Sequence, residues 1–305
     1  MNQINTLDFQ KDSTVGIINI LQENAVIELI IPDSLSMNSG RIQGYVSQLK
    51  ISSLAKSKYI LKKARKINLD KLDCILFRKD PPIDNQYINE LLILRELQYQ
   101  DTLVLNSPES LLRFNEKLLG YQLSEPKVPT LISGCLKEIE SFLKIQGVIV
   151  LKPLNLMAGK GIIKITSSKN SSKLISNHID EYKIIIAQKY LKEIIKGDNR
   201  IIIYNGIVEE NVLTRYPPKG DFIANLAQGG KYEIKKIQTK YLPVLERVAS
   251  YLKYHGIFFA GIDMIGEYIT EVNITSPTGI QQIKKGLPSK IAKELVREIK
   301  NYKTQ

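Results

Sequence analysis

The stretch "GIDMIGEYITEVNITSPTG", residues 261–279, decides the fold, because it is typical of two short strands joined by a turn at Gly266-Glu267. Asp263 lies among the apolar residues of the first strand, and Glu271 and Asn273 lie among those of the second. Side chains two positions apart on a strand project from the same face, and a residue on the paired strand can lie opposite them. We therefore expect these three oxygen-bearing side chains to converge.

Converging oxygen ligands suit Mg²⁺, which also leaves coordination positions for phosphate. The alternative interpretation is the solvated face of an edge strand. However, the flanking sequence "GIFFAGIDMI" (256–265) is strongly apolar, and buried carboxylates require a cation or a hydrogen-bond partner. The pattern therefore favours a metal site formed by Asp263, Glu271 and Asn273.

Length and composition restrict the class of protein. A chain of 305 residues allows two or three domains. No run of 18 apolar residues is present, and the first residues lack the basic and apolar regions of a secretory signal, so we expect no membrane span and no export. Two cysteines, Cys74 and Cys135, provide no disulfide framework. These features predict a cytoplasmic protein.

The formal charge of +12 raises the possibility of a nucleic-acid partner. The lysines are scattered, however, and the one tight cluster, "KKARK" (62–66), contains no aromatic residues. We therefore predict no nucleic-acid partner, with a basic nucleic-acid-binding protein as the alternative, which would bind in a strongly salt-dependent way. A positive field also suits ATP and acidic peptides.

Helical and strand patterns alternate along the chain, which predicts an α/β fold. Helices are predicted over residues 12–24, 85–100 and about 239–255, and strands over 25–32, 72–82, 102–108, 147–154 and 182–191. Residues 199–208 predict a hairpin with its turn at Asn205-Gly206.

Two segments between these elements are of particular interest. "SPESLLRFNEKLLGYQL" (107–123) predicts one short helix with Asn115-Glu116-Lys117 in its middle. Residues 215–233 contain Pro and Gly without a regular period, and long irregular loops in compact domains are often lids or binding loops.

Several basic residues are candidates for anion binding. Lys152 follows the buried run "VIVL", where its charge is costly unless the ammonium group reaches an anion, and Lys117 is a similar but weaker case. Solvent exposure is the alternative for both lysines. Arg200 and Arg215 suit bidentate contacts with phosphate or carboxylate, with surface ion pairs as the alternative. The glycines of "MAGKGI" (157–162) allow close approach of phosphate, although the Walker pattern is absent.

Taken together, six blocks of sequence resemble the bacterial glutathione synthetase family, a group of ATP-grasp ligases. The blocks are "CILFRKDPPID" (74–84), "LVLNSPESLLRFNEKL" (103–118), "VLKPL" (150–154), "AQKYLKEIIKGDNRIII" (187–203), "NLAQGG" (225–230) and "GIDMIGEYITEVNITSPTGI" (261–280). They occur in the order of the family and cover most of the chain from about residue 72.

The resemblance implies an N-terminal Rossmann-like domain over residues 1–115 and an ATP-grasp domain over 116–303. The latter would comprise a central lid subdomain, about 125–195, and a C-terminal subdomain, about 196–303. The family begins with a strand ahead of the segment that matches residues 5–14, so we expect the first strand of the Rossmann-like sheet to be lacking. Loss of a strand from a parallel sheet should expose backbone groups and apolar surface.

The resemblance also implies roles for individual residues. ATP would be bound by Lys117, Lys152, Gly159, Gly161 and Asp198, with Gln188, Tyr190 and Leu191 beside the adenine. The reacting phosphate would lie near Arg200 and Arg215. The metal, Mg²⁺ or alternatively Mn²⁺, would be bound by Asp263, Glu271 and Asn273. Substrate loops would contribute Arg78, Asp80, Ser276 and Thr278.

The implied reaction joins γ-glutamylcysteine to glycine through an acyl phosphate formed with ATP, and the implied assembly is a homotetramer. Such chemistry requires positioning and charge neutralisation rather than a protein nucleophile. One departure concerns the phosphate loop, where the family has Asp-Gly-Met-Gly-Gly and this chain has Asn155–Gly159. The alternatives are an ATP-grasp peptide ligase with another acceptor and a degenerate homologue that binds ATP without catalysis.

Overall fold

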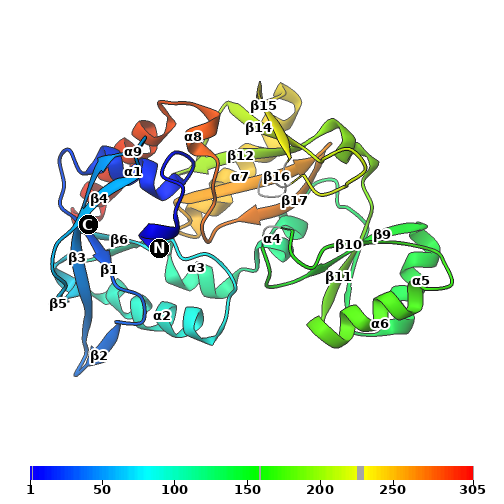
Figure 1. Ribbon diagram of the computed structural model, residues 1–305, viewed down its shortest axis with the longest axis horizontal. Helices are drawn as coiled ribbons and strands as arrows, with labels where there is room; N and C mark the ends of the chain where they lie inside the picture. The colour runs from blue at the N-terminus through cyan, green and yellow to red at the C-terminus, as the bar shows by residue number, and fades with distance from the viewer. Residues whose placement is uncertain (2, 158, 225–229, 305) are drawn as a thin grey trace.

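The computed structural model describes residues 1, 3–157, 159–224 and 230–304. The elements form three groups along the chain, each built around its own sheet (Figure 1). The antiparallel sheet of the N-terminal group lies at one end of the molecule and the sheet of the middle group at the other. The sheet of the third group lies between them, so residues from all three groups can meet there.

The N-terminal group contains both antiparallel and parallel pairing. Its elements are α1 (Ser13–Leu21), β1 (Ile27–Ile30), β2 (Ser36–Asn38), β3 (Arg41–Ser53), β4 (Lys58–Leu61), β5 (Arg65–Asn68), β6 (Cys74–Leu76), α2 (Asn85–Arg95), β7 (Leu103–Leu105) and α3 (Pro108–Arg113). The long strand β3 pairs antiparallel with β1, β2, β4 and β5, whereas β6 and β7 pair in parallel.

The α/β class predicted from the sequence is confirmed, but the N-terminal prediction was incomplete. The parallel, Rossmann-like part consists of β6 and β7 among the described residues. The five-stranded antiparallel sheet was not predicted. Its signal was present in the alternation along β3, where Ile42, Val46, Leu49 and Ile51 are buried between more exposed residues.

A cavity of about 1040 Å³ lies beside the parallel pair. It is bordered by β6, β1 and apolar side chains of α1 and of α9 (Leu287–Lys303), including Ile18, Leu21 and Ile299. Within the described residues β6 forms a ladder with β7 alone. Apolar surface and one edge of β6 therefore border open space at this end of the fold.

The middle group forms a four-stranded antiparallel sheet with two helices on one face. Its elements are α4 (Glu116–Leu123), β8 (Thr130–Ser133), α5 (Leu136–Gln146), β9 (Val148–Pro153), β10 (Ile163–Thr166), α6 (Ser171–Tyr182) and β11 (Ile185–Lys189). The strand order is β10-β9-β11-β8. Ile139 and Leu143 of α5 pack on Ile149 and Leu151 of β9, so the alternate residues of β9, including Lys152, point away from the helices.

The prediction of a single helix over residues 107–123 was wrong. Phe114 and Asn115 are extended and separate α3 from α4. The side-chain oxygen of Asn115 accepts hydrogen bonds from the backbone N–H groups of Lys117 and Leu118. Asn115 is therefore an N-cap, a role that its short polar side chain favours. Glu116 and Lys117 lie in the first turn of α4 rather than in mid-helix.

The third group provides the central sheet. Its elements are β12 (Asp198–Tyr204), β13 (Ile207–Val208), β14 (Asn211–Tyr216), β15 (Lys231–Lys236), α7 (Leu242–Tyr254), β16 (Phe259–Ile265), β17 (Tyr268–Asn273), α8 (Ile280–Ile283) and α9 (Leu287–Lys303). The order β15-β14-β12-β16-β17 confirms the predicted pairing of β16 with β17. The predicted turn at Asn205-Gly206 is also confirmed, with φ angles of 47° and 78°.

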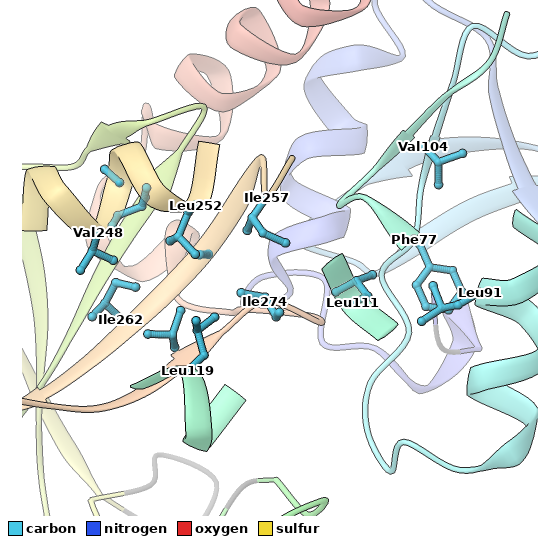
Figure 2. Packing of buried hydrophobic residues seen from close by; sticks show 14 of the residues in the cluster. Phe77, Leu91, Val104, Leu111, Leu119, Val248, Leu252, Ile257, Ile262 and Ile274 are labelled. Atoms are coloured by element: carbon cyan, nitrogen blue, oxygen red, sulfur yellow. The ribbon is translucent and has the colours of Figure 1, made fainter. Parts of the chain in front are cut away.

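The central sheet and the N-terminal group share one hydrophobic core. The odd-numbered isoleucines of β12 pack with Leu245, Val248 and Leu252 of α7. Figure 2 shows this cluster continuing past Ile274 and Leu111 toward β6 and α2. A shared core fixes the N-terminal group relative to the strands of the central sheet.

No helix in the described part of the chain has both the length and the apolar character needed to cross a bilayer.

Candidate active site

Four neighbouring strands place charged and amide side chains on one face of the central sheet. Because the odd-numbered isoleucines of β12 face α7, its even-numbered residues Asp198 and Arg200 face the other way. The strand registers place Arg215 of β14 opposite Asp198, Asp263 of β16 opposite Arg200, and Glu271 of β17 opposite Asp263. The sheet thus concentrates these residues on a single surface.

Arginine and aspartate alternate in a buried network on this surface. Arg200 donates from Nε and Nη2 to the two carboxylate oxygens of Asp263, at 2.5 and 2.8 Å. Arg215 donates from Nη2 to Asp198 at 2.5 Å and approaches Asp263 at 2.9 Å. Two cations and two anions therefore balance one another, which makes their burial tolerable.

The network shifts the pKa values of the two aspartates in opposite directions. Burial raises the pKa of Asp198 to about 6, and the lowering effect of Arg215 does not overcome it. Burial also opposes ionisation of Asp263, but the charges of Arg200 and Arg215 outweigh it and lower that pKa to about 2. Asp263 is the carboxylate that is held firmly in its charged form.

The residues predicted to bind a metal lie together on paired strands. Asp263 and Glu271 are cross-strand neighbours, and Asn273 donates from Nδ2 to an Asp263 oxygen at 3.1 Å and to the Gly261 carbonyl at 3.2 Å. Both of these hydrogen bonds use the Asn273 nitrogen, which leaves its side-chain oxygen available as a ligand. Two carboxylates and one amide oxygen form a donor set that suits a hard divalent cation.

The first turn of α4 brings a lysine to the same place. Lys117 is 9% exposed, and its Nζ lies 3.2 Å from a Glu271 carboxylate oxygen and 2.6 Å from the carbonyl oxygen of Leu156. A Cβ on Gly120 would lie 2.8 Å from the Glu271 Cα atom, so only glycine permits this approach of α4 to β17. Lys117 is therefore held between the metal-ligand candidates and the loop after β9.

The open face of the middle sheet supplies a second lysine. Lys152 donates to the side-chain oxygen of Gln188 at 2.8 Å, and Gln188 donates in turn to Thr130 at 3.0 Å. Burial lowers the pKa of Lys152, while the charges of Glu271, Asp198 and Asp263 oppose that shift. A small pocket joins Lys152 and Gln188 to Lys117 across the space between the sheet and α4.

The loop after β9 departs from the family pattern at Leu156 and Ala158, of which Ala158 lies outside the described residues. Leu156 lies outside the positive-φ region, whereas Gly159 and Gly161 have φ angles of 75° and 67°. A Cβ on Gly161 would also lie 2.7 Å from the Pro153 Cγ atom. Gly159 and Gly161 thus occupy positions that require glycine, whereas the position of Leu156 does not require it.

The segment predicted to lie beside adenine follows β11. Tyr190 donates its backbone N–H to the carbonyl of Val148, and the ammonium of Lys164 lies 4.6 Å from the centre of the Tyr190 ring. Phe222 meets the same ring edge-on at 6.4 Å. Leu191 is buried. Most of the "NLAQGG" block, residues 225–229, lies outside the described residues.

The two predicted substrate loops contact each other through Arg78. This side chain is 6% exposed, donates from Nη2 to the Pro277 carbonyl at 2.7 Å and from Nε to Thr14 at 3.1 Å, and stacks over Phe259. Its Nη1 is buried without a hydrogen-bond partner. Burial lowers the pKa of Arg78 to about 10, and nearby carboxylates, including that of Asp80, oppose the shift.

The remaining predicted substrate residues lie in the loop after β17. Arg200 donates from Nη1 to the carbonyl of Thr278 at 3.3 Å, so this loop adjoins the buried arginine–aspartate network. Ser276 is partly exposed and the Thr278 side chain is exposed. Within the described residues the network reaches this loop through the Thr278 backbone carbonyl rather than through either side chain.

Two residues at the start of α4 were missed as site residues. Glu116 is buried and accepts hydrogen bonds from residues 274 and 275 of the loop after β17. Asn115 donates to the carbonyl of Leu154 in the loop after β9. The "NE" that precedes Lys117 is typical of a helix start, and this signal could have placed both residues beside the site.

Comparisons with known proteins agree with this arrangement. A model of the prokaryotic glutathione synthetase ATP-grasp domain matches residues 116–287, and a model of the N-terminal domain of the same enzymes matches residues 1–112. The boundary between the two matches falls at the break between α3 and α4.

Two curated relatives match over nearly the whole chain. The glutathione synthetase of Wigglesworthia glossinidia brevipalpis is 34% identical over 289 residues, which cover 93% of this chain and 90% of the relative. That of Buchnera aphidicola subsp. Baizongia pistaciae is 33% identical over 312 residues, covering 100% of this chain and 96% of the relative.

Solved structures support the same fold. An ATP-grasp ligase of Chryseobacterium gregarium, solved with ADP and leader and core peptides, superimposes with a TM-score of 0.61 at 11% identity, covering 96% of this chain and 95% of that one. At this identity the likeness concerns the fold alone. The matches to both family models and to the full-length relatives show that the chain belongs to the prokaryotic glutathione synthetase family.

Proposed function

We propose that this protein joins γ-glutamylcysteine to glycine with ATP, as a glutathione synthetase. The observation that carries the proposal is the convergence of charged residues from three parts of the chain. Lys117 of α4 contacts Glu271 of β17, and Lys152 of β9 shares a pocket with Lys117. Lysines and carboxylates brought together in this way suit a triphosphate and its divalent cation.

The proposed chemistry has two steps. An oxygen of the cysteinyl carboxylate attacks the γ-phosphorus of ATP, ADP leaves, and an acyl phosphate forms. The glycine nitrogen then attacks the acyl carbon, phosphate leaves, and the amine loses its proton. Arg200 and Arg215 would stabilise the phosphoryl oxygens, because they are positioned by Asp263 and Asp198 before substrate binds.

Nucleotide binding is assigned to the surfaces of the middle group. We propose that Lys117 and Lys152 contact the phosphates, with Asp198 nearby and Gly159 and Gly161 allowing the backbone to approach them. Gln188, Tyr190 and Leu191 would adjoin the adenine. The partly buried hydrogen bond from Lys152 to Gln188 supports this assignment, because it fixes the lysine in the pocket.

The family uses a divalent metal, and we propose that it is Mg²⁺ here, with Mn²⁺ as a substitute. Asp263, Glu271 and Asn273 would hold it, and all three provide the oxygen ligands that Mg²⁺ prefers. When bound, the metal would neutralise negative charge on the phosphates. The hydrogen bonds from Arg200 to Asp263 and the ion pair between Lys117 and Glu271 orient the two carboxylates.

Substrate binding is assigned to the loops that meet at Arg78. Its buried Nη1 lacks a hydrogen-bond partner, and a buried donor of this kind is costly unless a ligand satisfies it. A carboxylate of γ-glutamylcysteine would supply the missing acceptor. We propose that Asp80, Ser276 and Thr278 line the same region, because Asp80 follows Arg78 closely and the other two flank Pro277.

We further propose two domains, over residues 1–115 and 116–303, with the latter divided into a lid subdomain (about 125–195) and a C-terminal subdomain (about 196–303). The two family matches, which end at residue 112 and begin at residue 116, support the first boundary. A homotetramer and a cytoplasmic location complete the proposal. The use of ATP and the two free cysteines favour that location.

A single assay tests the proposed function. The purified chain is incubated with ATP, Mg²⁺, γ-glutamylcysteine and glycine, and ADP and glutathione are quantified. Equal amounts of both products are expected, and omission of glycine in the presence of hydroxylamine should yield the hydroxamate of the trapped acyl phosphate. Nucleotide binding with neither product would indicate a degenerate homologue. ADP release with a different amine would indicate another acceptor.

A further inference from the structure

The first turn of α4 contains a buried carboxylate that has no place in the chemistry described above. Glu116 is 8% exposed, and one of its oxygens, Oε1, accepts three hydrogen bonds. The donors are the backbone N–H of Ile274 at 2.7 Å, the backbone N–H of Thr275 at 2.9 Å, and the Thr275 hydroxyl at 2.9 Å. This single oxygen therefore fixes the start of the loop after β17.

Two further side chains hold the same loop at successive positions. Arg78 donates to the carbonyl of Pro277, and Arg200 donates to the carbonyl of Thr278. Residues 274–278 are thus held by Glu116 of α4, Arg78 of the loop after β6, and Arg200 of β12. The backbone of this loop is positioned by side chains from three different parts of the fold.

The turn that carries Glu116 also contacts the opposite side of the site. Its neighbour Lys117 reaches the Leu156 carbonyl and Glu271, and the N-cap Asn115 donates to the Leu154 carbonyl at 3.0 Å. Consecutive residues of one helical turn therefore hold the loop after β9 and the loop after β17. The distance between these loops depends on that turn.

We propose that Glu116 is a positioning residue, which sets the substrate loop at residues 274–278 relative to the phosphate-binding lysine next to it. Glu116 contacts neither reacting atoms nor nucleotide, and it acts through Ile274 and Thr275. This inference rests on the proposed function, because it assigns the two loops to the dipeptide and to the nucleotide.

The cost of burial supports a specific role. Burial of a carboxylate is unfavourable unless donors compensate it, and here three donors converge on one oxygen. The nearby Glu271 carboxylate adds to this cost, and burial and Glu271 together raise the pKa of Glu116 against the lowering effect of the Thr275 and Ile274 hydrogen bonds. A neutral side chain would avoid this cost, and the three hydrogen bonds to the loop compensate it here.

Three substitutions separate positioning from folding. Glu116→Ala removes the acceptor, Glu116→Gln keeps an oxygen at the same position, and Thr275→Val removes one of the three donors. Glu209→Ala is the matched control. Glu209 is a buried carboxylate, 2% exposed, that accepts from Asn211 at 2.6 Å and forms an ion pair with Lys290 of α9.

Steady-state kinetics provide the first readout. For Glu116→Ala we expect the KM for γ-glutamylcysteine to rise about tenfold or more, which matches the loss of charge-assisted hydrogen bonds. The Kd for ATP, measured by calorimetry without the dipeptide, should change less than about twofold. Glu116→Gln should have a KM for γ-glutamylcysteine close to that of the wild type, and Thr275→Val should have a KM between those of the wild type and Glu116→Ala. Glu209→Ala should leave this KM unchanged.

Amide hydrogen exchange provides a readout that is independent of turnover. The amides of Ile274 and Thr275 should exchange at least about tenfold faster in Glu116→Ala than in the wild type, and at near wild-type rates in Glu116→Gln. Unchanged exchange at these amides would overturn the proposal even if the wild-type enzyme proved inactive. A loss of ATP affinity as large as the rise in the KM for γ-glutamylcysteine in Glu116→Ala would also overturn it. The same KM increase in Glu209→Ala would do so as well.

The wild-type protein could prove inactive while the amides of Ile274 and Thr275 respond to the Glu116 substitutions as expected. That result would contradict the proposed function and would still support the positioning of the loop by Glu116. If Glu116→Ala does not fold, the KM values and exchange rates of Thr275→Val and Glu116→Gln still test the positioning role of Glu116. A Thr275→Val variant with wild-type KM and wild-type exchange would count against the proposal.

Discussion

Arg200 and Asp263 lie directly opposite each other on β12 and β16 and form a two-point ion pair in the buried centre of the site. Arg215 approaches the same carboxylate from β14. The pair links the arginines proposed to act on phosphate to a proposed metal ligand. Charge that is fixed before substrate binds needs no rearrangement during the reaction.

Loss of the Glu271 charge should impair metal-dependent turnover while leaving the fold intact. We expect Glu271→Gln to lower kcat/KM by about 100-fold, the scale reported for loss of one preorganised electrostatic group. Phosphate release over a Mg²⁺ titration measures the effect, and thermal unfolding checks the fold. Glu267→Gln, in the turn of the same hairpin, is the control. Near wild-type activity of Glu271→Gln would refute the metal assignment.

Lys152 should contribute to nucleotide affinity rather than to stability. Its charge is buried and hydrogen-bonded to the neutral Gln188, so Lys152→Met removes a desolvated cation from the folded state. We expect the KM for ATP to rise about tenfold or more, which corresponds to loss of one charge-assisted hydrogen bond, with an unchanged or raised Tm. Lys189→Met, at an exposed position of the neighbouring strand β11, should change neither value. A wild-type KM for ATP would contradict the assignment.

Loss of Arg78 should weaken the binding of the dipeptide and not that of the nucleotide. Arg78→Met keeps an apolar side chain over Phe259 and removes the buried donor Nη1. We expect the KM for γ-glutamylcysteine to rise about tenfold or more, with the KM for ATP within about twofold of the wild type. Arg113→Met serves as a surface control. An equal rise in both KM values would indicate a general disturbance of the site.

The stability contributed by Asp263 should depend on pH in a defined window. Its folded-state pKa of about 2 lies below the ordinary value of 3.8, so the unfolded state binds a proton first as the pH falls. The contribution is therefore complete above about pH 4 and is lost between about pH 4 and pH 2. Its size is about 2 kcal/mol by the conversion of pKa shifts into free energy.

Asp263→Asn tests the predicted direction of this pH dependence. The free energy of unfolding, measured by urea denaturation, should be lower than that of the wild type at pH 7. The difference should shrink as the pH falls below about 4, where wild-type Asp263 becomes protonated in the unfolded state. Asp101→Asn, at an exposed position, should show no such trend. A difference that stays constant from pH 7 to pH 3 would contradict the prediction.

Gly120 should be intolerant of a methyl group. A Cβ at this position would lie 2.8 Å from the Glu271 Cα atom and 2.9 Å from its backbone nitrogen, and neither backbone atom can move away freely. We expect Gly120→Ala to lower the free energy of unfolding by about 1–3 kcal/mol, the usual cost of overpacking. Activity should fall as well, because Lys117 and Glu271 would separate. Chemical denaturation and the quantification of ADP and glutathione measure the two effects. Gly286→Ala, where a Cβ meets open space, is the control.

The sequence determined the elements that local patterns control. The hairpin of β16 and β17 follows from apolar alternation around Gly266-Glu267, and the turn at Asn205-Gly206 follows from residues that accept positive φ. The shared face of Glu271 and Asn273 follows from the two-residue period of a strand. Each of these features depends on residues close together in the chain, so sequence reasoning reached them.

Tertiary structure decided which of these elements meet. Asp198 and Arg215 are separated by a hairpin, and Arg200 and Asp263 are 63 residues apart, so only the strand order of the central sheet brings them into one network. The N-cap at Asn115, which divides the predicted helix, was visible in the sequence. Its consequence, a first turn whose Glu116 holds a loop 158 residues away, depends on packing between distant segments that no local pattern encodes.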